Sequence, residues 1–130
     1  MFDIEKLDVD KHAEDGVDVH IINPANKSDT GVVIRVLGVF APRFKELLRQ
    51  ARSKRELAKK ATAPGDEAKD DVTEVAEMLA DVTLTWSGVS EAGQEIPFSK
   101  SNAVRVYGKY SIIRGQVFDA ALDVANFVRG

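Results

Sequence analysis

The sequence predicts an α+β fold, in which an antiparallel β-hairpin or small sheet packs against three to four α-helices. Two short runs between residues 17 and 37 place a β-branched apolar residue at every second position, the period of a strand. After residue 42 the apolar residues recur every three or four positions instead, which is the period of a helix. At 130 residues and 44% hydrophobic, the chain can bury one core. We therefore expect an N-terminal arm (residues 1–16) and a single domain over residues 17–130.

The predicted hairpin follows the arm, which is acidic and shows no sustained period. The residues that would share one face are Val17, Val19 and Ile21 in the first strand and Val32, Ile34 and Val36 in the second. The loop between them, residues 23–31, contains Asn, Pro, Ser, Asp and Gly, the residues that favour turns. Because a two-stranded unit is marginal alone, we expect helices to cover its apolar face.

The first predicted helix spans residues 42–61. Pro42 suits its first turn, and apolar residues follow at helical spacing, namely Phe44, Leu47, Leu48 and Ala51. A Pro-Gly pair within the small and acidic residues 61–70 then predicts a flexible linker.

The next helix has the clearest pattern in the chain. Its apolar stripe consists of Val72, Val75, Leu79, Val82 and Trp86, spaced alternately by three and four. Asp71 and Glu74 resemble a capping box at its start, and Gly88 would end it in a left-handed conformation. We thus expect one helix from about residue 71 to Trp86, with core packing as the favoured role of the indole.

Two further helices are predicted around an ordered turn over residues 90–102. The first would be capped by Ser99 or Ser101 and would end at Tyr107, before Gly108. The second would run from Ser111 to the end of the chain along an apolar stripe formed by Ile113, Val117, Ala120, Ala121, Val124 and Val128.

Composition restricts the classes of function. No apolar run reaches the roughly 20 residues of a membrane span, and the start is acidic where a signal peptide would be cationic. The absence of cysteine fits a reducing compartment, so we expect a cytoplasmic protein. A net charge of -3 gives no overall attraction to nucleic acid or to anionic membranes.

Catalytic and metal-binding motifs are lacking. Residues 8–16 briefly resemble a calcium loop, but Ala13 stands where the glycine belongs and Val19 where the bidentate Glu belongs. His12 and His20 have no zinc-motif spacing and no evident triad partner. We therefore expect no catalytic residue, no metal, no cofactor and no enzyme activity.

A basic stripe lies in the first helix and consists of Arg43, Lys45, Arg49, Arg52, Lys54, Arg55, Lys59 and Lys60, against only Glu46 and Glu56. It could contact phosphates, so a small nucleic-acid-binding regulator that uses residues 43–60 stays open as an alternative. Protein contact is favoured, because the stripe lacks aromatic residues that would stack on bases.

The marked helices offer more apolar surface than one hairpin can cover, which favours self-association or binding to another protein. Phe98, like Trp86, is more simply explained by packing than by ligand binding. The candidate partner or oligomer contacts are Arg49, Arg52, Arg55, Phe98, Val124 and Phe127.

Several of these segments resemble a known family. The residues are WSGV at 86–89, GQEIPFS at 93–99, Asn102, Gln116, Asn126 and Phe127, together with VDVHIINP at 17–24 and GVVIRVLGVFAPRF at 31–44. In these the chain is similar to the tail assembly chaperones of long-tailed, non-contractile bacteriophages. The similarity covers residues 17–127 and consists of packing and turn residues, none of which performs diagnostic chemistry.

The resemblance implies an α+β protein of virion morphogenesis that binds the tape measure protein while tail tube subunits polymerise around it. Further implied partners are the major tail tube protein and a longer, frameshifted form of the same protein. It also implies a homo-oligomer in the host bacterial cytoplasm that is not retained in the mature virion. A structural head-tail or tail component, such as a connector or tail terminator, stays open as an alternative.

Overall fold

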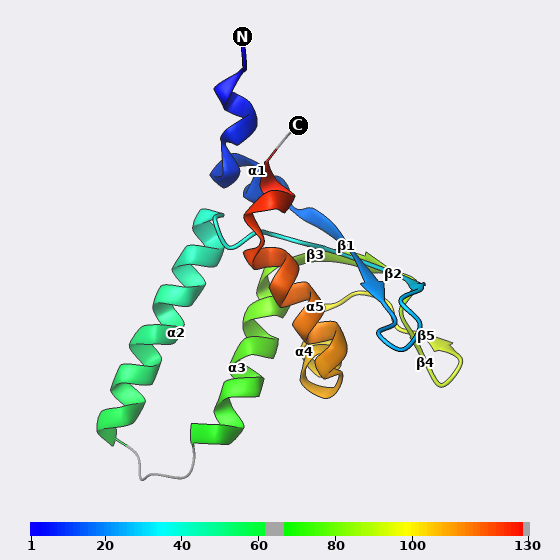
Figure 1. Cartoon of the computed structure of the whole chain (residues 1–130). Helices are drawn as coiled ribbons and strands as arrows, with labels where there is room; N and C mark the ends of the chain where they lie inside the picture. The colour runs from blue at the N-terminus through cyan, green and yellow to red at the C-terminus, as the bar shows by residue number, and fades with distance from the viewer. Residues whose placement is uncertain (62–66, 129–130) are drawn as a thin grey trace.

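The computed structural model describes residues 1–61 and 67–128, with the side chains of residues 1–53 and 72–128. It confirms the α+β class (Figure 1). The helices are α1 (Val9–Asp15), α2 (Pro42–Ala61), α3 (Glu67–Val82), α4 (Lys100–Lys109) and α5 (Ser111–Leu122), with 3-10 turns η1 (Ile4–Leu7) and η2 (Val124–Phe127). The strands are β1 (Val17–Ile22), β2 (Asp29–Val36), β3 (Thr83–Ser87), β4 (Ser90–Glu91) and β5 (Gln94–Glu95).

The main sheet is antiparallel, with the order β1-β2-β3. Val19 pairs with Ile34, which pairs in turn with Trp86, and these three side chains are buried. The alternate residues Asp18 and Arg35 lie on the other face, where Arg35 Nη1 donates to Asp18 Oδ1 at 3.0 Å. The sheet thus has one face in the core and one polar face, as is usual for antiparallel sheets.

The prediction that one helix continues to Trp86 is wrong. Helix α3 ends at Val82, and the next five residues form β3 on β2. The β-branched Thr83 and Thr85 favour an extended backbone, and the free edge of β2 supplies pairing partners that outweigh the local helical period. Trp86 is buried as expected, and its indole N–H donates to the Ile96 carbonyl at 2.9 Å. Gly88 does adopt a positive φ of 75°, but it ends a strand.

Three other helix limits differ from the sequence prediction, one of them being the end of α4, which runs past Tyr107 to Lys109. Helix α3 begins at Glu67, one turn before Asp71, within the segment predicted as a linker. The terminal helix ends at Leu122 rather than at the chain end, and η2 follows it, with the Asp123 carboxylate accepting the Ala125 N–H at 3.1 Å. The remainder of the predicted linker, residues 62–66, lies outside the described residues.

The core lies between the sheet and the helices α3, α4 and α5. Its largest fully buried side chains include Tyr107 and Phe44. Thr83 Oγ1 donates to the Leu79 carbonyl at 2.6 Å and lies 2.7 Å from the Tyr107 hydroxyl. Burial raises the pKa of Tyr107 to about 12, because an ionised phenol would lose its hydration there.

The two halves of the predicted N-terminal arm differ. Helix α1 packs on η2, with Ala13 fully buried and His12 Nδ1 2.8 Å from the Phe127 carbonyl oxygen. The first seven residues, which we call the leading segment (residues 1–7), are exposed. They project beyond the body at the N-terminus (Figure 1).

A small hairpin, β4–β5, is tied to α4 by one carboxylate. Glu91 accepts hydrogen bonds from the Tyr110 hydroxyl, from Arg105 Nη1 at 3.0 Å and from Lys109 Nζ at 3.2 Å. These donors, with Tyr110 first, lower the pKa of Glu91 to about 2. Helix α4 itself begins as predicted at Ser99, whose hydroxyl accepts the Asn102 N–H at 3.1 Å.

Candidate protein-binding groove

Helices α2 and α3 run side by side in opposite directions (Figure 1). Helix α2 is fixed to the body in its first turn, where Phe44 is fully buried and Arg43 Nε donates to the Asp81 carbonyl at 3.4 Å. One turn later, Leu47 and Leu48 are only half-buried. The two helices therefore meet along a narrow seam with a hollow on each side.

The larger hollow, of about 320 Å³, lies between α2, α3 and α5, and we call it the apolar groove. Its lining residues are Leu48, Ala51, Arg52, Glu74, Val75, Met78 and Phe118. Three helices thus contribute apolar side chains to one open concave surface, while Arg52 and Glu74 add one charge of each sign. Such a surface suits the apolar face of a helix from another protein.

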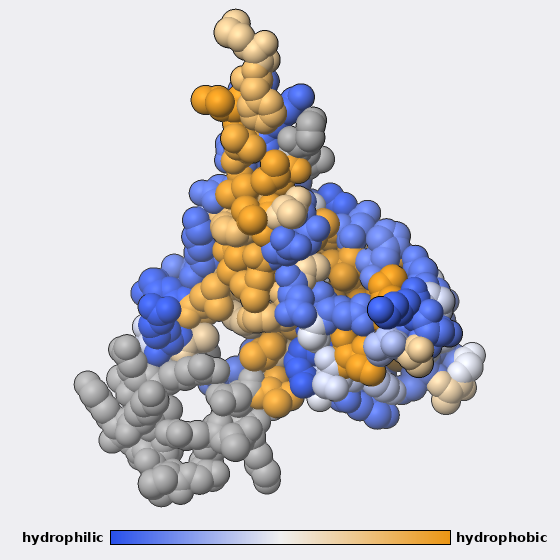
Figure 2. Space-filling view, in the orientation of Figure 1, coloured by the Kyte–Doolittle hydropathy of each residue, from blue (hydrophilic) through white to orange (hydrophobic). Residues whose placement is uncertain are grey.

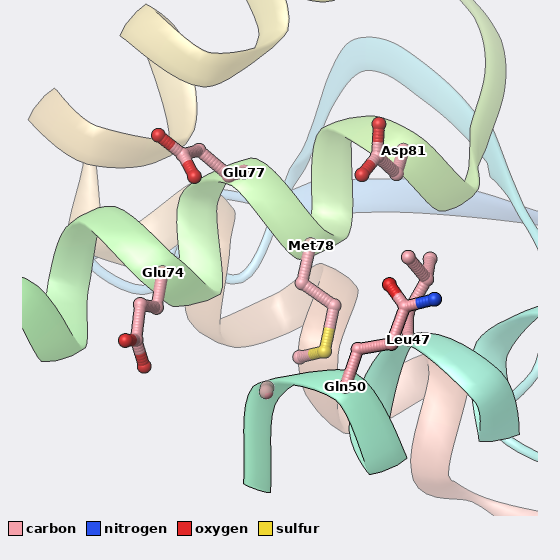
Figure 3. A pocket seen from close by; sticks show the side chains of 7 residues that line it. Leu47, Gln50, Glu74, Glu77, Met78 and Asp81 are labelled. Carbon is pink, nitrogen blue, oxygen red and sulfur yellow. The ribbon is translucent and has the colours of Figure 1, made fainter. Parts of the chain in front are cut away.

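The smaller hollow, of about 110 Å³, lies on the other side of the seam, and we call it the acidic hollow. It is lined by Leu47, Gln50, Ala51, Glu74, Glu77, Met78 and Asp81. Figure 3 shows Met78 pointing from α3 toward α2, where Leu47 and Gln50 lie. Because Met78 lines both hollows and its thioether chain is flexible, its rotamer can change the shape of either one.

Hydrophobic residues also gather in a band on the surface, from the leading segment over the adjoining body (Figure 2). Helix α1 packs on η2, so the two ends of the chain meet there. The exposed large hydrophobic residues of this region are Met1, Phe2, Ile4 and Leu7 near the N-terminus and Leu122, Val124 and Val128 near the C-terminus. A continuous apolar surface of this kind often marks a site of protein contact.

The described part of the basic stripe is exposed along α2. Arg49 donates to both carboxylate oxygens of Glu46, at 3.1 and 2.5 Å, and this hydrogen bonding lowers the pKa of Glu46. Lys45 Nζ lies 3.5 Å from Asp10 Oδ2 on α1. Two cations of the stripe therefore already face carboxylates of the same chain, whereas Arg52 lines the apolar groove.

The six predicted contact residues do not form one site. Arg49 and Arg52 are exposed on α2, while the side chain of Arg55 lies outside the described residues. Phe98 is half-buried and packs edge-on against Trp86, with ring centroids 5.2 Å apart and an interplanar angle of 77°. Val124 and Phe127 share η2, where Val124 is 50% exposed and belongs to the apolar band.

Phe127 was predicted as a partner or oligomer contact, which requires an exposed ring, but its ring is buried. Its ring is 1% exposed, lies against Gly38 and makes an edge-on contact with Phe40, at 5.9 Å between centroids. A partner could reach this ring only after η2 had moved away from the body. In this structure Phe127 is a core residue that fixes η2.

The groove residues that the predicted set lacks are Leu48, Ala51, Glu74, Val75, Met78 and Phe118. Leu48 and Val75 lie on the predicted helical stripes, so their apolar spacing was visible, but the stripes do not show which members leave the core. Phe118 lies beside the stripe of its helix, next to Val117. The groove lies where α2, α3 and α5 come together, and a one-dimensional pattern does not encode this arrangement.

The two histidines lie apart in the fold. His12 faces the Phe127 carbonyl, whereas His20 Nδ1 lies 3.5 Å from Asp29 Oδ2 across β1 and β2. Among the side chains of residues 1–53 and 72–128, no three from His, Asp or Glu lie close enough together to hold a metal ion.

Among the helices in the described part of the chain, none is long and apolar enough to cross a membrane. Comparisons of the chain with protein-family models, with curated proteins and with solved structures gave no significant match.

Proposed function

We propose that this chain is a tail assembly chaperone of a long-tailed, non-contractile bacteriophage. It binds the tape measure protein through passive protein contact, associates with itself, and aids polymerisation of the tail tube. The observation that carries the proposal is the apolar groove, in which α2, α3 and α5 present apolar side chains to the exterior. The sequence resemblance over residues 17–127 supports the same role.

The properties of a tape measure protein, the proposed client of this chaperone, explain why an apolar groove suits the role. A tape measure protein is long, helical and apolar in places, so its apolar stripes need cover until the tube encloses them. A groove that binds one face of an amphipathic helix contacts apolar side chains spaced three and four residues apart on that helix. Met78 lets the groove adapt to anchors of different shape, which suits a client that presents many different stretches in succession.

The proposal includes the remaining partners and the location. The major tail tube protein and the longer, frameshifted form of this chain are further partners, and the complex forms in the host bacterial cytoplasm. The chaperone leaves before the virion is complete. Mass spectrometry of finished particles would contradict this if it found the chain there in stoichiometric amounts, as a head-tail or tail component would be.

Co-purification with the tape measure protein encoded beside this chain tests the client. We expect Met78→Glu and Phe118→Glu each to reduce recovery of the tape measure protein by about tenfold, because a buried unpaired carboxylate costs on the order of 1.4 kcal/mol or more. Ile112→Glu is the matched control, since Ile112 lies on α5, is 54% exposed and does not line the groove. Thermal melting should show that all three variants fold.

Two outcomes would overturn the proposal. One is equal recovery of the tape measure protein by wild type, Met78→Glu and Phe118→Glu. The other is a salt-dependent mobility shift with DNA or RNA that disappears in the triple variant Arg49→Glu, Arg52→Glu, Arg55→Glu, because phosphate contacts depend on salt through counterion release. That result would support a nucleic-acid-binding regulator instead.

A further inference from the structure

The leading segment exposes more apolar side chains than any other short stretch among the described residues. Met1, Phe2, Ile4 and Leu7 are 128, 60, 78 and 52% exposed. All four residues of η1 are exposed as well. A short segment with this much apolar surface is stabilised when a partner covers it.

The segment is shaped before any partner arrives. Asp3 Oδ1 accepts the Glu5 N–H at 3.0 Å and caps η1, and Asp8 Oδ1 accepts the Lys11 N–H at 3.2 Å and caps α1. In a 3-10 turn, side chains three positions apart lie one above the other. Ile4 and Leu7 therefore form one apolar ridge, and ordering this ridge on a partner costs less entropy than ordering a free coil.

The base of the segment is anchored so that the segment points away from its own groove. Ala13 is fully buried, and His12 holds α1 against η2 through the Phe127 carbonyl. Figure 1 shows the N-terminus at the opposite end of the molecule from the last turn of α2 and the first turn of α3. A second copy of the chain can accept the segment without breaking these contacts.

Charge favours the apolar groove as the acceptor. The leading segment carries Asp3 and Glu5 beside Ile4, while the α2 wall of the groove carries Arg52. The two carboxylates of the segment therefore have one cationic counterpart at the groove, and the apolar ridge of Ile4 and Leu7 has an apolar floor.

We propose that the leading segment of one copy binds in the apolar groove of a second copy. The contact is heterologous: one chain contributes the segment and the other the groove. When two copies exchange their leading segments, they form a closed dimer. When each copy gives its segment to a different neighbour, the copies form an open-ended row. The contact does not require a tape measure protein, so it can be tested separately from the proposed function.

Disulfide trapping tests the contact directly, because the natural sequence has no cysteine. Ile4→Cys and Ala51→Cys proteins, one of them enlarged by a tag, are mixed and oxidised gently. We expect a mixed disulfide dimer at a yield at least several-fold above that from Ile4→Cys mixed with Ile112→Cys, whose cysteine is exposed outside the groove. Equal yields from the two mixtures would overturn the proposal. A double variant, Ile4→Cys with Ala51→Cys, that cross-links only within one chain would overturn it too.

Sedimentation equilibrium gives a second readout in the full chain. Phe2→Asp combined with Ile4→Asp should raise the dissociation constant for self-association by about tenfold or more. Leu84→Asp changes an exposed leucine on the sheet and should leave the constant unchanged. The proposal fails if the Phe2→Asp, Ile4→Asp variant associates as tightly as wild type. This variant keeps its groove, so it should still co-purify with the tape measure protein. If wild type itself did not co-purify with the tape measure protein, that result would count against the proposed function and not against the contact between copies.

Discussion

Gln116 on α5 holds both backbone groups of Ile22 at the end of β1. The Ile22 N–H donates to Gln116 Oε1 at 2.8 Å, and Gln116 Nε2 donates to the Ile22 carbonyl oxygen at 2.7 Å. β1 is an edge strand, and its pairing with β2 shifts register between His20 and Ile22. A side-chain amide therefore supplies hydrogen-bond partners at the point where the ladder is irregular.

Gln116→Ala should lower the free energy of unfolding by about 1–3 kcal/mol, because it leaves a partly buried N–H and C=O without their partners. Urea denaturation measures the change, and hydrogen exchange should show faster exchange of the Ile22 amide. Gln50→Ala is the control, since Gln50 is exposed and makes only a 3.4 Å contact with Glu46. Equal midpoints for the two variants would contradict the role given to Gln116.

Gly38 lies under the Phe127 ring, and a Cβ added there would overlap the ring. Gly38→Ala should therefore destabilise the fold by about 1–3 kcal/mol through overpacking. Gly115→Ala, inside α5, meets nothing within 4 Å and should stabilise it by about 0.5–1 kcal/mol, because alanine favours helix. Thermal or urea unfolding of the pair checks the opposite signs, and a shift in the same direction for both would refute this packing.

The hydrogen bonds to Glu91 predict a pH dependence. Its pKa falls from 4.5 to about 2 in the folded chain, so the folded state favours the ionised carboxylate. This contribution to stability is fully present above pH 4.5 and is lost as the pH falls toward 2. Wild type should therefore lose more stability than Glu91→Gln between pH 5 and 2, measured as urea midpoints. Parallel pH profiles would show that Glu91 does not hold the β4–β5 hairpin in solution.

The buried pair Thr83 and Tyr107 should behave as a coupled unit. Thr83→Val leaves the Tyr107 hydroxyl without the oxygen that lies 2.7 Å away, and should cost about 1–3 kcal/mol. Tyr107→Phe removes the other hydroxyl. In the double variant neither hydroxyl is stranded, so its cost should be smaller than the sum of the two single costs. A strictly additive double-mutant cycle would exclude the coupling.

The strength of sequence reasoning differs between elements. Strands β1 and β2 were predictable because Val17, Val19 and Ile21 alternate over a turn-rich loop, and α4 because Ser99 is a good cap. Strand β3 was not, since Trp86 continues the spacing of α3 and only pairing with β2 changes the outcome. Local periodicity does not contain that long-range partner.

The candidate groove was less predictable than the fold. The sequence shows that the helices carry more apolar residues than one hairpin can cover, but it does not show which of them are buried. Phe127 lies in the core, whereas Phe118 lines the groove. The charged candidates Arg49 and Arg52 do lie exposed on α2. Arg49 bonds Glu46 on the same helix, a contact that helix periodicity predicts. Arg52 instead lines the groove with residues of α3 and α5, and helix periodicity alone does not place those helices.

Helix α2 is attached to the body at Phe44, in its first turn, so it can tilt about that end. The contacts with Asp10 and Asp81 also lie within its first turn, so a tilt there displaces each later residue in proportion to its distance from Phe44, Ala51 more than Leu48. Such a tilt would widen the apolar groove for a bulky aromatic side chain of a bound helix and narrow it for an alanine. In the proposed function, a groove whose width can change would accept helical stretches of different sequence.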